Sequence, residues 1–173
     1  MTVRRLGLAL SVFWCAAVVA GSAGAQGAEP IDHWNTNAVM AALQVLRASD
    51  IQAVTSQGRA AITARTRDEL NVGVYAKACD PAPPGVDPIC HGMESLISFD
   101  PGPRADRKGL ADRLNHQFAL GKFVDEPDGT IRLSSYLVFD GGITPGNLRA
   151  ELASLFAIAA LTTQTLWPAT SAR

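Results

Sequence analysis

The chain has 173 residues, and its 15 Lys and Arg residues nearly balance its 16 Asp and Glu residues, giving a formal net charge of −1. No basic block stands out, which argues against a protein that binds nucleic acid by neutralising phosphates with clustered cations. Beyond residue 25 no stretch is long and apolar enough to span a membrane, because a transmembrane helix needs about 20 apolar residues.

The N-terminal segment has the order of a secretory signal. Arg4 and Arg5 are followed by an uncharged, mostly apolar stretch over residues 6–20 and then by small residues that end at Ala25. This pattern predicts a signal peptide over residues 1–25 that is cleaved after Ala25, and export to the bacterial periplasm or out of the cell. An uncleaved N-terminal anchor is the alternative.

The remaining part of the chain, about 148 residues, suits a single domain. We expect a loose N-terminal tail over residues 26–31, one domain over residues 32–168 and a C-terminal tail over residues 169–173. A first helix is expected over residues 32–49, because three apolar residues form one stripe at helical spacing: Val39, Leu43 and Leu46.

Three strands are expected next. A short strand covers residues 60–65, after a turn at Gly58. A longer strand covers residues 70–79, where small and apolar residues alternate onto one face. The third strand covers residues 90–100.

Cys79 and Cys90 are the only cysteines left after signal cleavage, and two cysteines in an oxidising compartment usually form a disulfide. The segment between them is rich in Pro and Gly: Pro81, Pro83, Pro84, Gly85 and Pro88. Such a segment cannot be a helix or an inner strand. We therefore predict a surface loop that joins the second and third strands as a long hairpin, with a disulfide at its neck. Metal binding is disfavoured, as is haem attachment, which needs a C-x-x-C-H motif.

In the second half of the chain we expect a helix, a hairpin and a last helix. A second helix is expected over residues 105–120. A hairpin follows, with strands over residues 123–126 and 130–139 and a turn at Asp128-Gly129. A last helix covers residues 145–167, after a threonine N-cap and a proline at its first position. The predicted order is α-β-β-β-α-β-β-α, which indicates an α+β domain with an antiparallel sheet and helices packed on it.

The second helix, the Asp-Gly hairpin and the entry to the last helix carry distinctive motifs. The helix ends in Leu-Asn-His-Gln-Phe at residues 114–118, an Asp-Gly turn splits the strand pair at residues 128–129, and an apolar strand runs into Asp-Gly-Gly-Ile-Thr at residues 140–144. These motifs are similar to those of the YbjN family over residues 110–166. Over residues 32–100 mainly the order of the elements matches.

The resemblance implies a fold like that of type III secretion chaperones, which is a curved antiparallel sheet flanked by helices and often forms a dimer. The family is described as regulating sensory transduction, a role that names no catalytic residue, cofactor or substrate. This chain departs from the family in two respects. Phe118 stands roughly where many members carry tryptophan, and the export signal and the cysteine pair differ from the cytoplasmic members.

No catalytic constellation stands out in the sequence. The histidines have no metal-ligand spacing and are expected to be solvated surface residues: His33, His91 and His116. The acidic hairpin tip and the glycine pair before the last helix are explained as turns rather than as calcium or phosphate sites: Asp125, Glu126, Asp128, Gly141 and Gly142.

We therefore expect an exported, non-enzymatic protein without metal or cofactor. It would be a binding, chaperone-like or regulatory module that acts through protein–protein contacts, with an unidentified protein or peptide partner and a homodimer as one option. The alternative is a periplasmic hydrolase with a site around His116, together with Asp112 or Asn115. Residues 112 and 116 are four apart and can meet on one helix face.

Overall fold

A computed structural model describes residues 29–102 and 109–167. The predicted signal peptide over residues 1–25 and the C-terminal tail over residues 169–173 lie outside the described residues. The elements follow in this order: α1 (Thr36–Val45), β1 (Ser49–Ser56), β2 (Arg59–Arg65), β3 (Asn71–Cys79), β4 (Cys90–Phe99), α2 (Leu110–Gln117), β5 (Lys122–Asp125), β6 (Ile131–Val138) and α3 (Pro145–Leu166).

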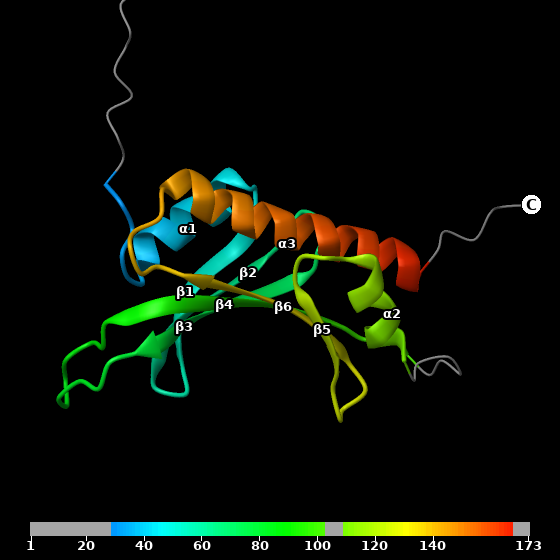
Figure 1. Ribbon diagram of the computed structural model, residues 1–173, viewed down its shortest axis with the longest axis horizontal. Coiled ribbons are helices and arrows are strands. Elements are labelled where there is room, and N and C mark those ends of the chain that lie inside the picture. The colour runs from blue at the N-terminus through cyan, green and yellow to red at the C-terminus, as the bar shows by residue number, and fades with distance from the viewer. Residues whose placement is uncertain (1–28, 103–108, 168–173) are drawn as a thin grey trace, which may run out of the picture.

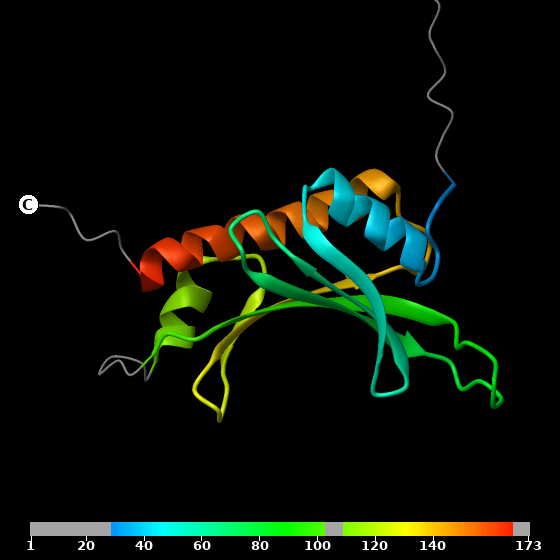
Figure 2. The same cartoon turned by 180° about the vertical axis from the view of Figure 1, so that it is seen from behind.

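The strands form one six-stranded antiparallel sheet in the order β1-β2-β3-β4-β6-β5. The sheet is curved, with α1 and α3 over one face and α2 beside β5 (Figure 1). In both views, no helix of the described residues lies over the opposite face of the sheet (Figures 1 and 2). The prediction of an α+β domain with an antiparallel sheet and packed helices is confirmed.

One strand was missed by the sequence analysis. Residues 49–56 form β1, so the order is α-β-β-β-β-α-β-β-α rather than α-β-β-β-α-β-β-α. The first helix is shorter than predicted for two reasons. The Asn35 side chain accepts a hydrogen bond from the Ala38 N–H and caps its start. Arg47, just beyond its end, has a φ of 60° and cannot continue a right-handed helix.

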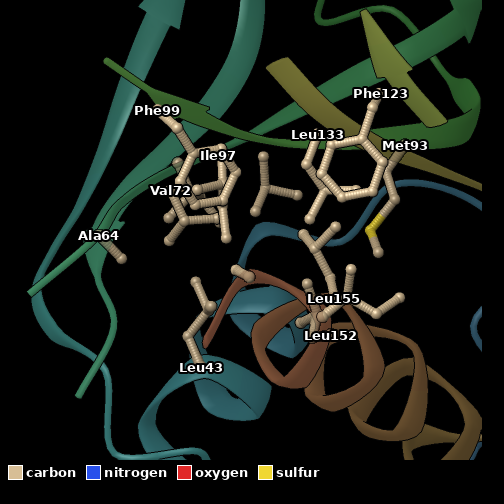
Figure 3. Packing of buried hydrophobic residues seen from close by; sticks show 14 of the residues in the cluster. Leu43, Ala64, Val72, Met93, Ile97, Phe99, Phe123, Leu133, Leu152 and Leu155 are labelled. Carbon is tan, nitrogen blue, oxygen red and sulfur yellow. The ribbon is translucent and has the colours of Figure 1, made fainter. Parts of the chain in front are cut away.

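The core lies between the sheet and the two helices that cover it. Alternate residues of the strands point to this face, since side chains of a strand alternate between the two faces of its sheet. Figure 3 shows side chains of the sheet meeting those of α1 and α3; among the fully buried ones are Leu43, Met93, Ile97, Phe99, Leu133, Leu152 and Leu155.

The start of α3 is fixed by its N-cap and by pairing of the preceding residue with the N-terminal segment. Thr144 accepts a hydrogen bond from the Asn147 N–H (3.1 Å), and Pro145 occupies the first turn, as predicted. Ile31 pairs with Ile143 through backbone hydrogen bonds of 2.8 and 2.9 Å and is 8% exposed. Ile31 is therefore part of the domain rather than the end of a loose tail. None of the helices in the described ranges is long and apolar enough to cross a membrane.

Candidate functional site

β1 forms one edge of the sheet and is poorly covered. Six of its eight residues are exposed. In residues 29–102 and 109–167 no strand pairs with its outer side. A two-residue turn joins β1 to β2, and both of its residues, Gln57 and Gly58, have positive φ (51° and 75°). These angles are those of the tight hairpin turn whose twist matches that of the strands.

This turn decides which backbone groups of β1 face outward. Because a two-residue turn is flanked by a hydrogen-bonded pair, every second residue back from Ser56 bonds to β2, and Val54 pairs with Ala61 in this way. The intervening residues, Ala53 and Thr55, therefore direct their N–H and C=O groups away from the sheet. We call the outer side of Ala53 and Thr55 the open edge.

β5 forms the opposite edge, which is closed by a side chain. The amide of Asn115, on α2, donates to the C=O of Phe123 (2.9 Å) and accepts from its N–H (2.8 Å). The two backbone groups of Phe123 that a further strand would bind are thus satisfied within the chain. The rings of Phe118 and Phe123 lie 5.9 Å apart and fasten α2 to this strand. We call this the closed edge.

A hollow of about 650 Å³ lies beside the open edge. Its lining comes from the start of α1, the β1–β2 hairpin and the loop between β3 and β4, and includes Trp34, Thr36, Ala53, Val54, Thr55, Pro88 and Ile89. Val54 is 37% exposed and Ile89 is 55% exposed, so the hollow offers apolar surface to a ligand. We call it the edge hollow.

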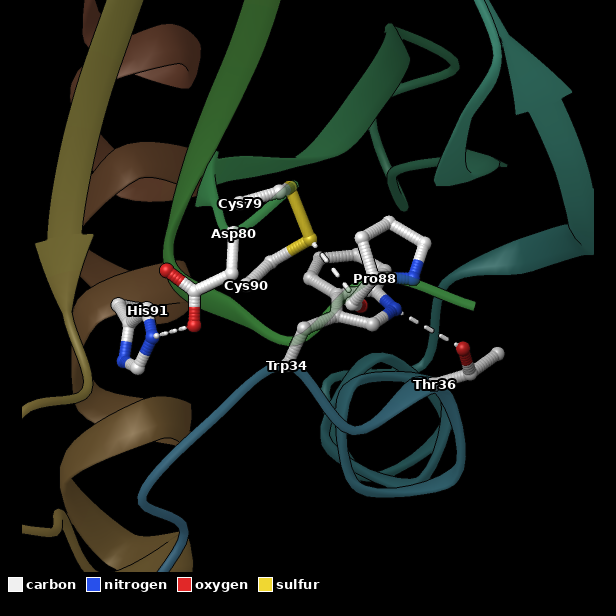
Figure 4. Close-up of a disulfide and its surroundings, with 7 residues drawn as sticks. All are labelled: Trp34, Thr36, Cys79, Asp80, Pro88, Cys90 and His91. Atoms are coloured by element: carbon white, nitrogen blue, oxygen red, sulfur yellow. Dashed lines mark hydrogen bonds and ion pairs between the residues drawn. A yellow bond between two sulfur atoms is a disulfide. The ribbon is translucent and has the colours of Figure 1, made fainter. Parts of the chain in front are cut away.

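The wall of the edge hollow is fixed by hydrogen bonds and by a disulfide. The backbone N–H of Trp34 donates to the Cys90 C=O (2.7 Å), and its indole N–H donates to the Thr36 hydroxyl (3.0 Å). Cys79 and Cys90 lie at disulfide distance, 2.06 Å between sulfur atoms, at the neck of the predicted loop (Figure 4). These contacts hold the wall of the hollow in place, and a preorganised site lowers the entropic cost of binding.

His91 ties this loop to a second part of the chain. Its Nε2 lies 3.1 Å from Asp80 Oδ2, at the loop's start, and its Nδ1 lies 2.9 Å from Asp140 Oδ1, after β6. The hydrogen bond to Asp80 is the largest cause that raises the pKa of His91 above its ordinary value of 6.5; the Asp140 carboxylate adds to it, and desolvation opposes it. His91 was expected to be a solvated surface histidine, but it is a partly exposed group held between two carboxylates.

This arrangement suits a structural link rather than a catalytic base, and we call His91 with Asp80 and Asp140 the clamp. Both ring nitrogens of His91 are taken by carboxylates, so neither is available to accept a proton from a substrate. The two carboxylates also lie on opposite nitrogens and cannot share a metal ion with the ring. Within the part of the chain that the structure describes, no group of three or more His, Cys, Asp or Glu side chains could hold a metal ion.

The residues of the alternative hydrolase do not form a site. His116 and Asp112 are both exposed on α2, and no hydrogen bond joins them in the described ranges. Asn115 is committed to the closed edge. His33, near the start of the described chain, contacts the neighbouring Asp32 carboxylate.

The turns singled out in the sequence have structural partners. Asp128 accepts hydrogen bonds from the N–H and the hydroxyl of Thr130 (2.9 and 2.8 Å). Glu126 forms an ion pair with Arg132 (2.9 Å). Residues 141–142 both have positive φ (84° and 81°) in the tight connection between β6 and α3.

No protein-family model matches the chain, and a search of the curated proteins finds no match. The resemblance to the YbjN family therefore stays a prediction that rests on the motifs in residues 110–166. The contrast between the two sheet edges is independent of that resemblance, because it follows from backbone register and from the Asn115 contacts.

Proposed function

We propose that this chain is an exported, non-enzymatic binding module that takes up an extended segment of a partner protein at the open edge. The observation that carries the proposal is the pair of outward-facing backbone groups on Ala53 and Thr55, next to a hollow whose lining includes apolar side chains. Addition of a peptide strand to an exposed sheet edge is a recurring mode of recognition. A chaperone-like or regulatory role, as the resemblance to the YbjN family suggests, would act through this contact.

The open edge and the edge hollow would recognise such a peptide in two ways. Its backbone would continue the sheet beyond β1, and these hydrogen bonds depend little on sequence. Alternate side chains would point to the side of the edge hollow, where Trp34, Pro88 and Ile89 offer apolar contacts. The partner segment should therefore carry apolar or aromatic residues at every second position.

Residence outside the cytoplasm is part of the proposal. The cysteine pair fits an oxidising compartment, and the predicted signal peptide would take the chain to the periplasm or out of the cell. Intact-mass analysis of the exported protein tests this directly. A mass that includes residues 1–25, or one that corresponds to two free thiols on Cys79 and Cys90, would contradict it.

The binding mode is tested with a displayed library of random peptides that is panned on the exported protein. Enriched peptides are labelled, and their affinity is measured by fluorescence anisotropy. We expect Thr55→Pro to lower the affinity by about tenfold or more, because it removes an outward N–H donor from the open edge. Thr55→Val keeps that N–H and serves as the matched control, with an affinity close to that of the original chain.

Two results would contradict the proposal. The first is the absence of any enriched peptide from panning on a folded, monodisperse sample, and the second is unchanged affinity in Thr55→Pro. Sedimentation analysis distinguishes the remaining occupant of the edge. A dimer that Thr55→Pro converts to a monomer would assign the open edge to a second copy of the chain and not to a peptide.

A further inference from the structure

The face of the sheet that α1 and α3 leave uncovered carries a second hollow, of about 450 Å³. Its lining residues belong to β1, β2, β3 and β4, whose arrangement in the sheet is seen in Figures 1 and 2. Side chains from all four strands line it, among them Gln52, Thr63, Asn71, Tyr75 and Ser98. We call it the face hollow. Its lining is mixed, because Ala64, Val72 and Leu96 lie among these polar and aromatic side chains.

The polar side chains of the face hollow have unused hydrogen-bonding capacity. Gln52, Thr63, Asn71 and Ser98 are all exposed, and none makes a side-chain hydrogen bond within residues 29–102 and 109–167. Together they present two amides and two hydroxyls, groups that both donate and accept. A ligand that itself carries many donors and acceptors would match them.

An aromatic ring lies within this polar surface. A Cβ atom at Gly73 would come within 2.6 Å of the Tyr75 ring, so the phenol end of Tyr75 lies directly over the Gly73 backbone. Tyr75 is only partly buried. The glycine thus lets the ring lean along the strand, where it can serve as a platform for a flat, weakly polar ligand surface.

The two charged side chains that line the face hollow, Arg65 and Asp50, are paired with one another. Arg65 lies 3.0 Å from Glu69 and 3.8 Å from Asp50, and Lys77 lies 2.7 Å from Glu94. Within the face hollow itself, little charge is left to attract an anion such as a phosphate or an acidic peptide. An apolar ligand would leave the polar lining unsatisfied, which costs free energy.

The geometry points to an uncharged oligosaccharide as the ligand of the face hollow. One face of a pyranose ring carries C–H groups that stack on an aromatic ring, and its rim carries hydroxyls that both donate and accept. The first would rest on Tyr75, and the second would bond the amides and hydroxyls of Asn71, Ser98 and their neighbours. This site lies on a different surface from the open edge and does not depend on the proposed peptide binding.

The test is a titration of the isotope-labelled exported protein with three neutral hexasaccharides, followed by NMR: a β-1,4-glucan, a β-1,4-linked N-acetylglucosamine oligomer and an α-1,4-glucan. At least one should shift the amide signals of Thr63, Asn71 and Ser98. We expect Tyr75→Ala to weaken that binding by about tenfold. Gly73→Ala should weaken it several-fold while keeping the tyrosine, because the added methyl group pushes the ring from its place.

Tyr136 provides the matched control, since it is an exposed tyrosine on the same face that lies over Gly92, outside the face hollow. Tyr136→Ala should bind as the original chain does, and so should Thr55→Pro. The inference is overturned if none of the three sugars shifts these signals up to its solubility limit. It is also overturned if Tyr75→Ala binds unchanged, or if Tyr136→Ala loses as much affinity as Tyr75→Ala.

Discussion

β5 and β1 end the same sheet in different ways. At β5 the Asn115 amide binds both the N–H and the C=O of Phe123, so a side chain stands where the next strand would lie. At β1 the corresponding groups of Ala53 and Thr55 have no strand beside them in the described residues. A single side-chain amide therefore occupies the backbone groups of the short strand β5. No such side chain binds Ala53 or Thr55 of the longer strand β1 in the described residues.

The two edges also differ in the devices that normally discourage strand pairing. Natural edge strands are protected by lysine, proline, bulges or short length. β5 is four residues long. β1 is twice as long, has neither Lys nor Pro in its eight residues, and carries an irregularity only at its start, between Ser49 and Gln52. Protection is thus confined to the first half of β1, and the half that borders the edge hollow is left accessible.

The largest effect is expected from opening the closed edge. Asn115→Ala removes two hydrogen bonds and leaves the partly buried N–H and C=O of Phe123 without their partner. We expect the free energy of unfolding to fall by about 3 kcal/mol. The measurement is a urea titration, in which the midpoint should fall while the slope stays unchanged.

Gln117→Ala is the matched control, because Gln117 lies exposed on the same helix. It should change the stability by less than about 0.5 kcal/mol. Asn115→Asp keeps the acceptor but loses the donor and should fall between the two. If Asn115→Ala were as stable as Gln117→Ala, the closed edge would not depend on the amide.

A smaller effect separates the two sides of β1. Val54→Pro removes an N–H that bonds to β2, and we expect a loss of about 2 kcal/mol. Thr55→Pro removes an N–H that faces outward and should cost less than about 1 kcal/mol. Thermal or urea unfolding of the two variants checks the difference. Equal losses would mean that Thr55 does not face outward and that the open edge is wrongly placed.

Much of the sheet was predictable because its strands have a covered face and an open face. β3 and β6 alternate in sequence for this reason, and both were found close to their observed bounds. β1 was missed because nearly all of its residues are exposed. A strand with no buried face lacks the apolar alternation by which strands are predicted. The same exposure makes β1 a candidate binding edge.

The contacts that define the sites depend on residues far apart in sequence. The partners of His91 are 11 and 49 residues away along the chain, and no local spacing indicates them. The sequence suggests Asn115 only as an alternative to Asp112 in a site around His116, and the four-residue helical spacing applies to Asp112. The actual partner of Asn115, Phe123, becomes visible only once α2 is packed against β5. The cysteine pair was predictable because the two cysteines flank a Pro-rich segment that cannot be a helix or an inner strand.

The smallest effect concerns His91 and its two carboxylate partners at the base of the β3–β4 loop. Because the hydrogen bonds to Asp80 and Asp140 raise the pKa of His91, the folded chain holds this proton more tightly than the unfolded chain does. Its contribution to stability is therefore fully present below the ordinary pKa of 6.5 and is lost as the pH rises through the raised value. The two carboxylates are largely exposed and screened by salt, so we expect a modest shift in the urea midpoint.

The comparison is between the original chain and His91→Gln, each unfolded in urea between about pH 5 and about pH 9. The original chain should lose its advantage over His91→Gln as the pH rises, and Asp140→Asn should show an intermediate dependence, since it leaves only the Asp80 partner. Parallel profiles for the original chain and His91→Gln would contradict the clamp. In that case the position of the loop, and with it the wall of the edge hollow, would depend on contacts other than those of His91, such as the disulfide and the Trp34 hydrogen bond to Cys90.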